Sequence, residues 1–284
     1  MQAYIRDDLK LIFKQESDLI FTLGRSIDLR YKSNLIIILL TLSATALGWL
    51  FTDDGVVGLY LGGGVFLSWA LSRELDPAHT LSAFKAAGLV FFTIFSPDSF
   101  QPVLVFWLLL LMRLINGITG KKLTLIDLLS TLAFTGFLSF TRENSLYLLI
   151  FVLTTVSLVT IGERSKSVLI VGGLALLLLA GQIVIMDSLN FVSLNEIDFL
   201  MGSLLALTLL SVPFFRQLSQ TAIEDDKGET VDSIRVFSGQ LLYSAAIILL
   251  TLTGSLTFND QLIYLAVVSG ILIHFVQVNL LKID

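Results

Sequence analysis

Long runs of apolar residues, separated by short polar gaps, extend from residue 34 almost to the end of the chain. A helix needs about 20 apolar residues to cross the roughly 30 Å hydrocarbon core of a bilayer, and most of the runs approach that length. The pattern predicts ten transmembrane helices, at about residues 34–51, 55–71, 77–95, 102–115, 123–140, 146–161, 168–186, 199–215, 236–256 and 261–281. The expected fold is all-α, a polytopic integral membrane protein with a single transmembrane domain over residues 34–284.

The first 33 residues follow a different pattern. Apolar residues recur there at helical spacing, and basic residues form a separate row: Ile5, Leu9, Ile12 and Phe13 against Arg6, Lys10 and Lys14. This pattern predicts an amphipathic helix within residues 1–24 that lies at the membrane interface or packs beneath the membrane domain. Acidic residues interrupt the apolar ones, so no cleavable signal peptide is predicted.

Composition supports the membrane assignment and excludes several chemistries. Hydrophobic residues make up 55% of the chain and charged residues only 14%, which is outside the range of soluble globular proteins. The chain has no cysteine, which excludes disulfides, thiolate metal sites and cysteine nucleophiles. Its two histidines argue against haem and His-rich metal centres. We therefore expect no cofactor and no metal site.

Basic residues predict how the chain is threaded through the membrane. Lys and Arg lie in alternate gaps or at their edges, with Lys85 and Arg142 as the exceptions. Because basic residues are retained on the cytoplasmic side, both termini are expected in the cytoplasm, with a long cytoplasmic loop at 216–235. The predicted location is the plasma (inner) membrane. The two charge signs are sorted rather than mixed, so membrane lipids are the expected partners and nucleic acid is not.

Small residues in the second predicted span point to close helix packing. Gly58 and Gly62 form a small-xxx-small pair, which lets two helix backbones approach each other. We expect this pair to pack against a neighbouring helix and not to contact a ligand.

Ionisable residues within apolar spans are costly and mark candidate functional sites. Most of them here fall in or beside the predicted cytoplasmic halves of their spans: Lys85, Arg113, Asp127 and His274, with the amides Asn116 and Gln277. If the helices bring them together, they line a cavity that opens to the cytoplasm. Lys85 is the deepest, about 12 Å along its helix from Pro77, although a lysine can also extend back to the interface.

Several of these residues have a structural and a functional interpretation. Arg113 and Asn116 share a helix face and either anchor the helix end or bind a phosphate or carboxylate. Asp127 follows Thr124 at the spacing of a capping box, which explains it without catalysis. His274 and Gln277 either join neighbouring helices or contribute to proton coupling or substrate contact.

Four titratable residues lie close together after the second span: Arg73, Glu74, Asp76 and His79. They suit an acid/base pair or a cation site. The alternative is a loop followed by a helix that Asp76 caps and Pro77 begins. Sequence signatures of phosphate loops, zinc proteases, serine hydrolases, dinucleotide-binding domains and Asp-rich prenyltransferases are absent.

The first functional hypothesis is a secondary carrier for a small anionic or zwitterionic solute. Ten spans with both termini inside fit two inverted five-helix halves. Arg73, Lys85, Arg113 and Asn116 would bind the solute, and His274 or Asp127 would couple protons.

Two alternatives stay open. The first is an enzyme that acts on a lipid or polyprenyl phosphate at the cytoplasmic leaflet. In this enzyme, Glu74, Asp76 or His79 would transfer protons or bind a metal. The phosphate would be bound by basic residues: Arg73, Lys85, Arg113, Lys121 and Lys122. The second is a non-catalytic scaffold or complex subunit that docks its partner on the loop at 216–235.

Overall fold

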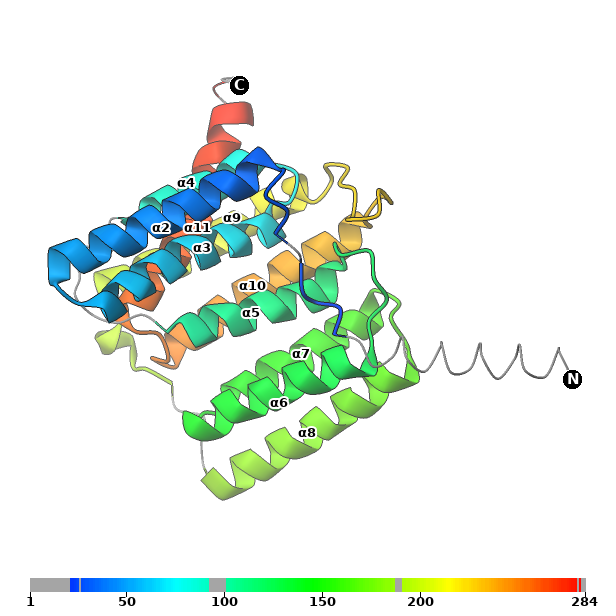
Figure 1. The fold of residues 1–284 in the computed structure, drawn as a ribbon. Coiled ribbons are helices and arrows are strands. Elements are labelled where there is room, and N and C mark those ends of the chain that lie inside the picture. Colours follow the sequence, from blue (N-terminus) through cyan, green and yellow to red (C-terminus); the bar gives the residue numbers. More distant parts are fainter. Residues whose placement is uncertain (1–20, 26, 92–100, 187–190, 280, 282–284) are drawn as a thin grey trace, which may run out of the picture.

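The computed structural model describes residues 21–25, 27–91, 101–186, 191–279 and 281. Within these ranges the ordered structure is helical, apart from one isolated β-bridge between Glu224 and Thr230. The described residues form a short 3-10 turn, η2 (Leu194–Glu196), and ten α-helices (Figure 1): α2 (Lys32–Thr52), α3 (Gly55–Leu75), α4 (Thr80–Val90), α5 (Pro102–Asn116), α6 (Leu125–Thr141), α7 (Leu146–Thr160), α8 (Lys166–Met186), α9 (Phe199–Leu218), α10 (Ser233–Leu252) and α11 (Phe258–Asn279). The predicted amphipathic helix lies almost wholly outside the described residues.

Six of these helices are long and apolar enough to cross a membrane: α2, α3, α8, α9, α10 and α11. The others are shorter apolar helices, with 11 residues in α4, 15 in α5 and α7, and 17 in α6. The all-helical architecture is consistent with the multi-pass membrane protein that the apolar runs predict. The count of ten spans and the side of the membrane on which the termini lie stay predictions.

The prediction for the junction between the second and third spans is wrong in two respects. α3 continues to Leu75, so Arg73 and Glu74 lie in its last turn and not in a loop. Asp76 does not cap a helix that begins at Pro77, because α4 begins only at Thr80. The local Asp-Pro pattern is overridden because the chain turns here, which lets α4 pack against both α3 and α11.

α5 and α10 pack against each other at the centre of the molecule. α5 also contacts α3, α6 and α7, and α10 also contacts α3, α7 and α9. The helices α2, α3, α4, α9 and α11 lie on one side of this pair, and α6, α7 and α8 lie on the other (Figure 1). Trp107, Leu108 and Leu111 on α5 are completely buried, as expected of a helix with neighbours on all sides.

Loops that the basic residues predict to lie on one side of the membrane do meet at one end of the molecule. Arg235, at the start of α10, donates to the backbone O of Ile115 at the end of α5 and pairs with Glu163 after α7. The backbone N–H of Asp226 donates to the backbone O of Ile118. At the opposite end, the backbone N–H of Gln101 donates to Asp260.

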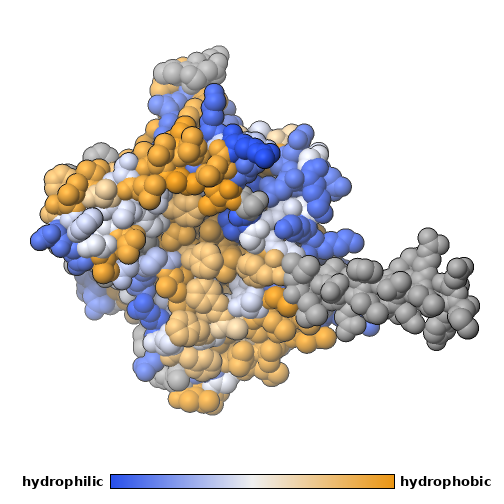
Figure 2. All heavy atoms as spheres, in the orientation of Figure 1, coloured by the Kyte–Doolittle hydropathy of each residue, from blue (hydrophilic) through white to orange (hydrophobic). Residues whose placement is uncertain are grey.

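Large apolar side chains are exposed along the outer helices. On α8, Val184 and Ile185 are 85% and 80% exposed, and on α2, Leu50 and Phe51 are 77% and 75% exposed. Figure 2 shows side chains of this kind as a broad apolar surface across the face that it draws. A surface of this extent suits contact with lipid, because hydrocarbon tails solvate apolar side chains at no cost.

The predicted packing role of Gly58 is confirmed. α2 and α3 lie so close that a Cβ atom on Gly58 would be 2.5 Å from the backbone O of Thr45 and 2.9 Å from the backbone N of Trp49. Both are backbone atoms of α2, which cannot move aside as a flexible side chain can.

Gly58→Ala is therefore expected to lower the free energy of unfolding by about 1–3 kcal/mol, because the added methyl group forces α2 and α3 apart. The midpoint of thermal unfolding in detergent micelles measures this loss. Gly88→Ala in α4 is the matched control, since nothing lies within 4 Å of a Cβ at that position. An equal loss of stability in the two variants would contradict the packing explanation.

Candidate functional site

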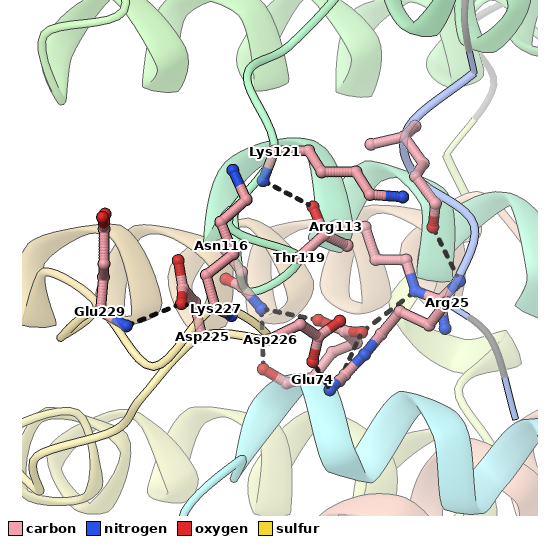
Figure 3. A network of polar contacts seen from close by, with 11 residues as sticks. Arg25, Glu74, Arg113, Asn116, Thr119, Lys121, Asp225, Asp226, Lys227 and Glu229 are labelled. Atoms are coloured by element: carbon pink, nitrogen blue, oxygen red, sulfur yellow. Dashed lines mark hydrogen bonds and ion pairs between the residues drawn. The ribbon is translucent and has the colours of Figure 1, made fainter. Parts of the chain in front are cut away.

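Glu74, in the last turn of α3, is the centre of a charged cluster at the end of the molecule where the basic loops meet. Its side chain is almost completely buried, at 1% exposure. Arg113 Nε on α5 donates to Glu74 Oε1 at 3.0 Å, and Asn116 Nδ2 donates to the backbone O of Glu74 at 2.8 Å. Figure 3 shows these side chains converging. Arg113 and Asn116 therefore act from one helix face, as their spacing predicts.

The segment before α2 supplies a second arginine to this cluster. Arg25 Nη1 lies 3.9 Å from Glu74 Oε1, and Arg25 Nη2 donates to Asp226 Oδ1 at 2.6 Å (Figure 3). Arg113 Nη1 also donates to the backbone O of Leu23 at 3.0 Å. Sequence reasoning missed Arg25 and Asp226 as members of the site. Their partners are far away in the chain, so no local pattern indicates them.

Arg73 is the third guanidinium near Glu74. Its Nη1 donates to Thr80 Oγ1 at 2.9 Å, and within the described residues no carboxylate lies within 4.0 Å of its side-chain nitrogens. Three arginines thus surround one buried carboxylate, with Asp226 at the exposed edge. Asp76 also acts electrostatically on Arg73, so the charges of the cluster balance. What the cluster offers an anion is guanidinium N–H groups without a carboxylate in contact, those of Arg73 above all.

A pocket of about 260 Å³ opens beside the arginines, between α3 and α5. Its polar end is formed by the three arginines and Glu74, and its apolar walls include Phe66, Trp69 and Phe106. We call this pocket the α3–α5 groove. Phe66 precedes Arg73 by seven residues, and Phe106 precedes Arg113 by seven. On each helix, the aromatic residue therefore lies about 10 Å from the arginine along the helix axis, away from the charged end.

Trp69, in the wall of the groove, carries an unpartnered hydrogen-bond donor. Its Nε1 is buried, and no hydrogen-bond acceptor lies within reach of it in the described part of the chain. A buried N–H without a partner costs free energy, so this part of the wall is not optimised for stability alone.

The other predicted site residues form a second cluster between α4 and α11. Lys85 Nζ lies 3.1 Å from His274 Nδ1 and donates to Gln277 Oε1. The rings of His79 and His274 are 5.1 Å apart between centroids, and His79 Nδ1 lies 2.8 Å from Asp76 Oδ1. None of these residues lines the α3–α5 groove. Arg73, Glu74 and Arg113 therefore share one groove, whereas Lys85, His79 and His274 lie outside it. A cavity that opens to the cytoplasm stays a prediction.

Asp127 has the structural role that its spacing predicts. Asp127 Oδ2 accepts from the backbone N–H of Thr124 at 2.9 Å, and Thr124 Oγ1 accepts from the backbone N–H of Asp127 at 3.2 Å. The same carboxylate accepts from the backbone N–H and the hydroxyl of Thr22, at 2.6 and 2.7 Å. Asp127 thus caps α6 and also fastens the segment before α2.

No group of three or more His, Asp or Glu residues within the described part of the chain is arranged to hold a metal ion. Comparison with known protein families, curated proteins and solved structures finds no match to this chain. The functional argument therefore rests on the geometry of the two clusters.

Replacing the buried carboxylate tests its role as counter-charge. Glu74→Gln is expected to lower the free energy of unfolding by about 2–3 kcal/mol, because Arg113 and Arg25 lose their shared partner. Both arginines keep partial contact with water, which limits the loss. The matched control is Glu163→Gln, since Glu163 pairs with Arg235 but is 39% exposed, and we expect a change of at most about 1 kcal/mol there. Thermal unfolding in micelles compares the two. Similar losses would show that Glu74 is no more important than a surface carboxylate.

The contact between His79 and Asp76 predicts that the stability of the protein depends on pH. The hydrogen bond that His79 donates to Asp76 raises the pKa of His79 above 6.5, against the opposing effect of partial burial. Its contribution to stability is therefore complete below about pH 6.5, the pKa in the unfolded chain, and is lost as the pH rises through the higher folded pKa. The difference in unfolding midpoint between the wild type and His79→Gln should shrink from about pH 5 to about pH 9. A difference that is constant or grows with pH would contradict this assignment.

Proposed function

We propose that this protein recognises an anionic amphiphile of the lipid phosphate or polyprenyl phosphate class at one face of the membrane. The phosphate would bind Arg25, Arg73 and Arg113, and the first part of the hydrocarbon chain would lie in the α3–α5 groove. The observation that carries the proposal is the groove itself, which combines a cationic end with aromatic walls.

The charges support an anionic headgroup. Arg25 and Arg113 share one buried carboxylate, and Asp226 balances Arg25 only at the exposed edge. Arg73 has no carboxylate partner among the described residues and lines the groove. Guanidinium groups bind phosphate oxygens by paired, charge-assisted hydrogen bonds, so a phosphate would complete the set. Basic pockets between membrane helices, on the side rich in positive charge, suit lipid headgroups for the same reason.

The apolar half of the groove supports a hydrocarbon chain rather than a small polar solute. Phe66, Trp69 and Phe106 line it, together with Leu67, Ala70 and Leu109. Residues at the start of α2 complete the wall, so the groove lies at an outer helix and not at the centre of the bundle. A ligand of this shape would keep its tail in lipid-like surroundings while its head reaches the arginines.

The arrangement favours recognition over acid/base catalysis. Glu74 is the only carboxylate among the groove-lining residues, and Arg113 already holds it at 3.0 Å. We assign Glu74 the role of positioning the arginines. A carrier for a small anion is the second candidate, favoured by Lys85, His79 and His274 at the same end of the molecule.

Arg73→Gln tests the proposal, because Arg73 lacks a carboxylate partner and its loss leaves the Glu74 pairs in place. The dissociation constant for dioctanoyl phosphatidate in detergent micelles is expected to rise about tenfold, which equals about 1.4 kcal/mol for one charge-assisted hydrogen-bonding group. Titration calorimetry measures it. The matched control is Arg164→Gln, because Arg164 is an exposed arginine that does not line the groove. This variant should bind dioctanoyl phosphatidate with the affinity of the wild type.

Two further ligands test the contributions of the phosphate headgroup and of the hydrocarbon tails separately. Glycerol 3-phosphate carries the head alone, and dioctanoyl phosphatidylcholine carries the tails with a neutral head. Both are expected to bind more weakly than phosphatidate. Equal binding of glycerol 3-phosphate would overturn the role of the apolar walls, and equal binding of phosphatidylcholine would overturn the role of the arginines.

A further inference from the structure

A second pocket, of about 440 Å³, lies at the opposite end of the molecule from the α3–α5 groove. Polar residues dominate its lining, among them Arg142, Asn144 and Ser255. Asp260 lies next to this pocket and is completely buried. Its Oδ1 accepts from the backbone N–H of Gln101 at 2.8 Å, and Gln101 also lines the pocket. Asp260 Oδ2 accepts from the backbone N–H and the hydroxyl of Thr257, at 2.9 and 2.6 Å, so this carboxylate caps the start of α11 and also lies directly behind a polar opening.

Two buried tyrosines continue from Asp260 into the apolar interior. Tyr264 follows Asp260 by four residues on α11, so both lie on one helix face. Its ring is 6.4 Å from the ring of Tyr243 on α10, between centroids. Both tyrosines are 0% exposed, and neither hydroxyl has a hydrogen-bond partner in the described part of the chain.

Gln240 and Asp76 extend this set to the other end of the bundle. Gln240 precedes Tyr243 by three residues on α10, and its Nε2 donates to the backbone O of Leu75 at 2.6 Å. Gln240 Oε1 and Asp76 Oδ2 are buried and lack partners among the described residues. Asp76 Oδ1 contacts His79, whose side chain is 30% exposed. Polar groups thus succeed one another from the 440 Å³ pocket to the end that holds the α3–α5 groove.

Unpartnered buried polar atoms are rare in proteins, because each costs free energy that an apolar side chain would not. Among the described residues such atoms occur on several helices, and some of them lie next to one another. Four of the residues that carry them, Asp76 directly after α3, Gln240 and Tyr243 on α10 and Tyr264 on α11, succeed one another from one end of the bundle towards the other. Ionisable and hydroxyl groups in such a place are typical of proton relays in membrane proteins.

We propose that this path, from Asp260 through Tyr264 and Tyr243 to Asp76 and His79, conducts protons across the membrane domain, and that Gln240 Oε1 accepts a hydrogen bond from a water molecule that bridges Tyr243 and Asp76. The second lone pair of Asp260 Oδ1 takes up a proton that enters through the 440 Å³ pocket. Each tyrosine hydroxyl then accepts one proton and releases its own, with single water molecules bridging groups that do not touch. At the far end, His79 Nδ1 takes the proton from Asp76 and His79 Nε2 releases one to solvent. The net change is one proton moved, with no oxidation or reduction.

Tyrosine-to-phenylalanine variants test this path without disturbing the fold. The purified full chain is placed in liposomes, and proton entry is followed with an internal pH dye under a potential set by potassium and valinomycin. Tyr243→Phe and Tyr264→Phe are each expected to slow proton entry about tenfold or more, because a phenyl ring cannot relay a proton. Tyr31→Phe is the matched control, since Tyr31 is 65% exposed and lies outside the path, and it should behave as wild type.

Stability separates a relay from a structural role. Because the two hydroxyls have no partners, their removal is expected to leave the unfolding midpoint unchanged or higher. Slower proton entry with undiminished stability would support the path. Proton entry equal to that of wild type in both variants, or wild-type liposomes no faster than protein-free ones, would overturn it. Binding of dioctanoyl phosphatidate by Tyr243→Phe should be normal, so failure of this proposal is distinguishable from failure of the groove assignment.

Discussion

The carboxyl end of α3 is the constraint on which the rest of the structure depends. The last carbonyl groups of a helix have no partner within it, and this end is buried, so other parts of the protein must supply hydrogen-bond donors. Asn116 of α5 donates to the backbone O of Glu74, and Gln240 of α10 donates to the backbone O of Leu75. The two central helices are thereby fixed in position and rotation against α3, and Arg113, one turn before Asn116, is aimed at the Glu74 side chain.

Charges around this end hold parts of the chain that lack helical structure of their own. Arg25 joins the segment before α2 to both Glu74 and Asp226, and Asp127 holds the same segment through Thr22. Arg235 fastens the start of α10 to the end of α5. Most of these basic residues would have been counted only as topology signals under the positive-inside rule. Their contacts show that they also close one end of the bundle.

Features that depend on residues close together in the sequence could be predicted, and features that depend on distant residues could not. Apolar runs predicted the helices well, because burial in lipid or in the bundle needs a continuous apolar stretch. The Asp127 cap and the shared face of Arg113 and Asn116 were also predictable, since both depend on residues three apart. Asp76 was misjudged because the packing of α4 against α11 outweighs a local Asp-Pro pattern. The roles of Arg25 and Gln240 depend on partners far away in sequence, and no periodicity encodes those.

The buried tyrosines show a further limit of pattern reading. Within an apolar run, Tyr243 and Tyr264 look like ordinary aromatic core residues, and only their unpartnered hydroxyls distinguish them. Gln240, three residues before Tyr243, connects them to the end of α3, where it donates to the Leu75 carbonyl and where Asp76 begins the turn to α4. The α3–α5 groove depends there on full charges, whereas the path depends mainly on neutral groups. One helix end can therefore support both, because the guanidinium groups lie on its groove side and the hydroxyl and amide groups lead into the bundle.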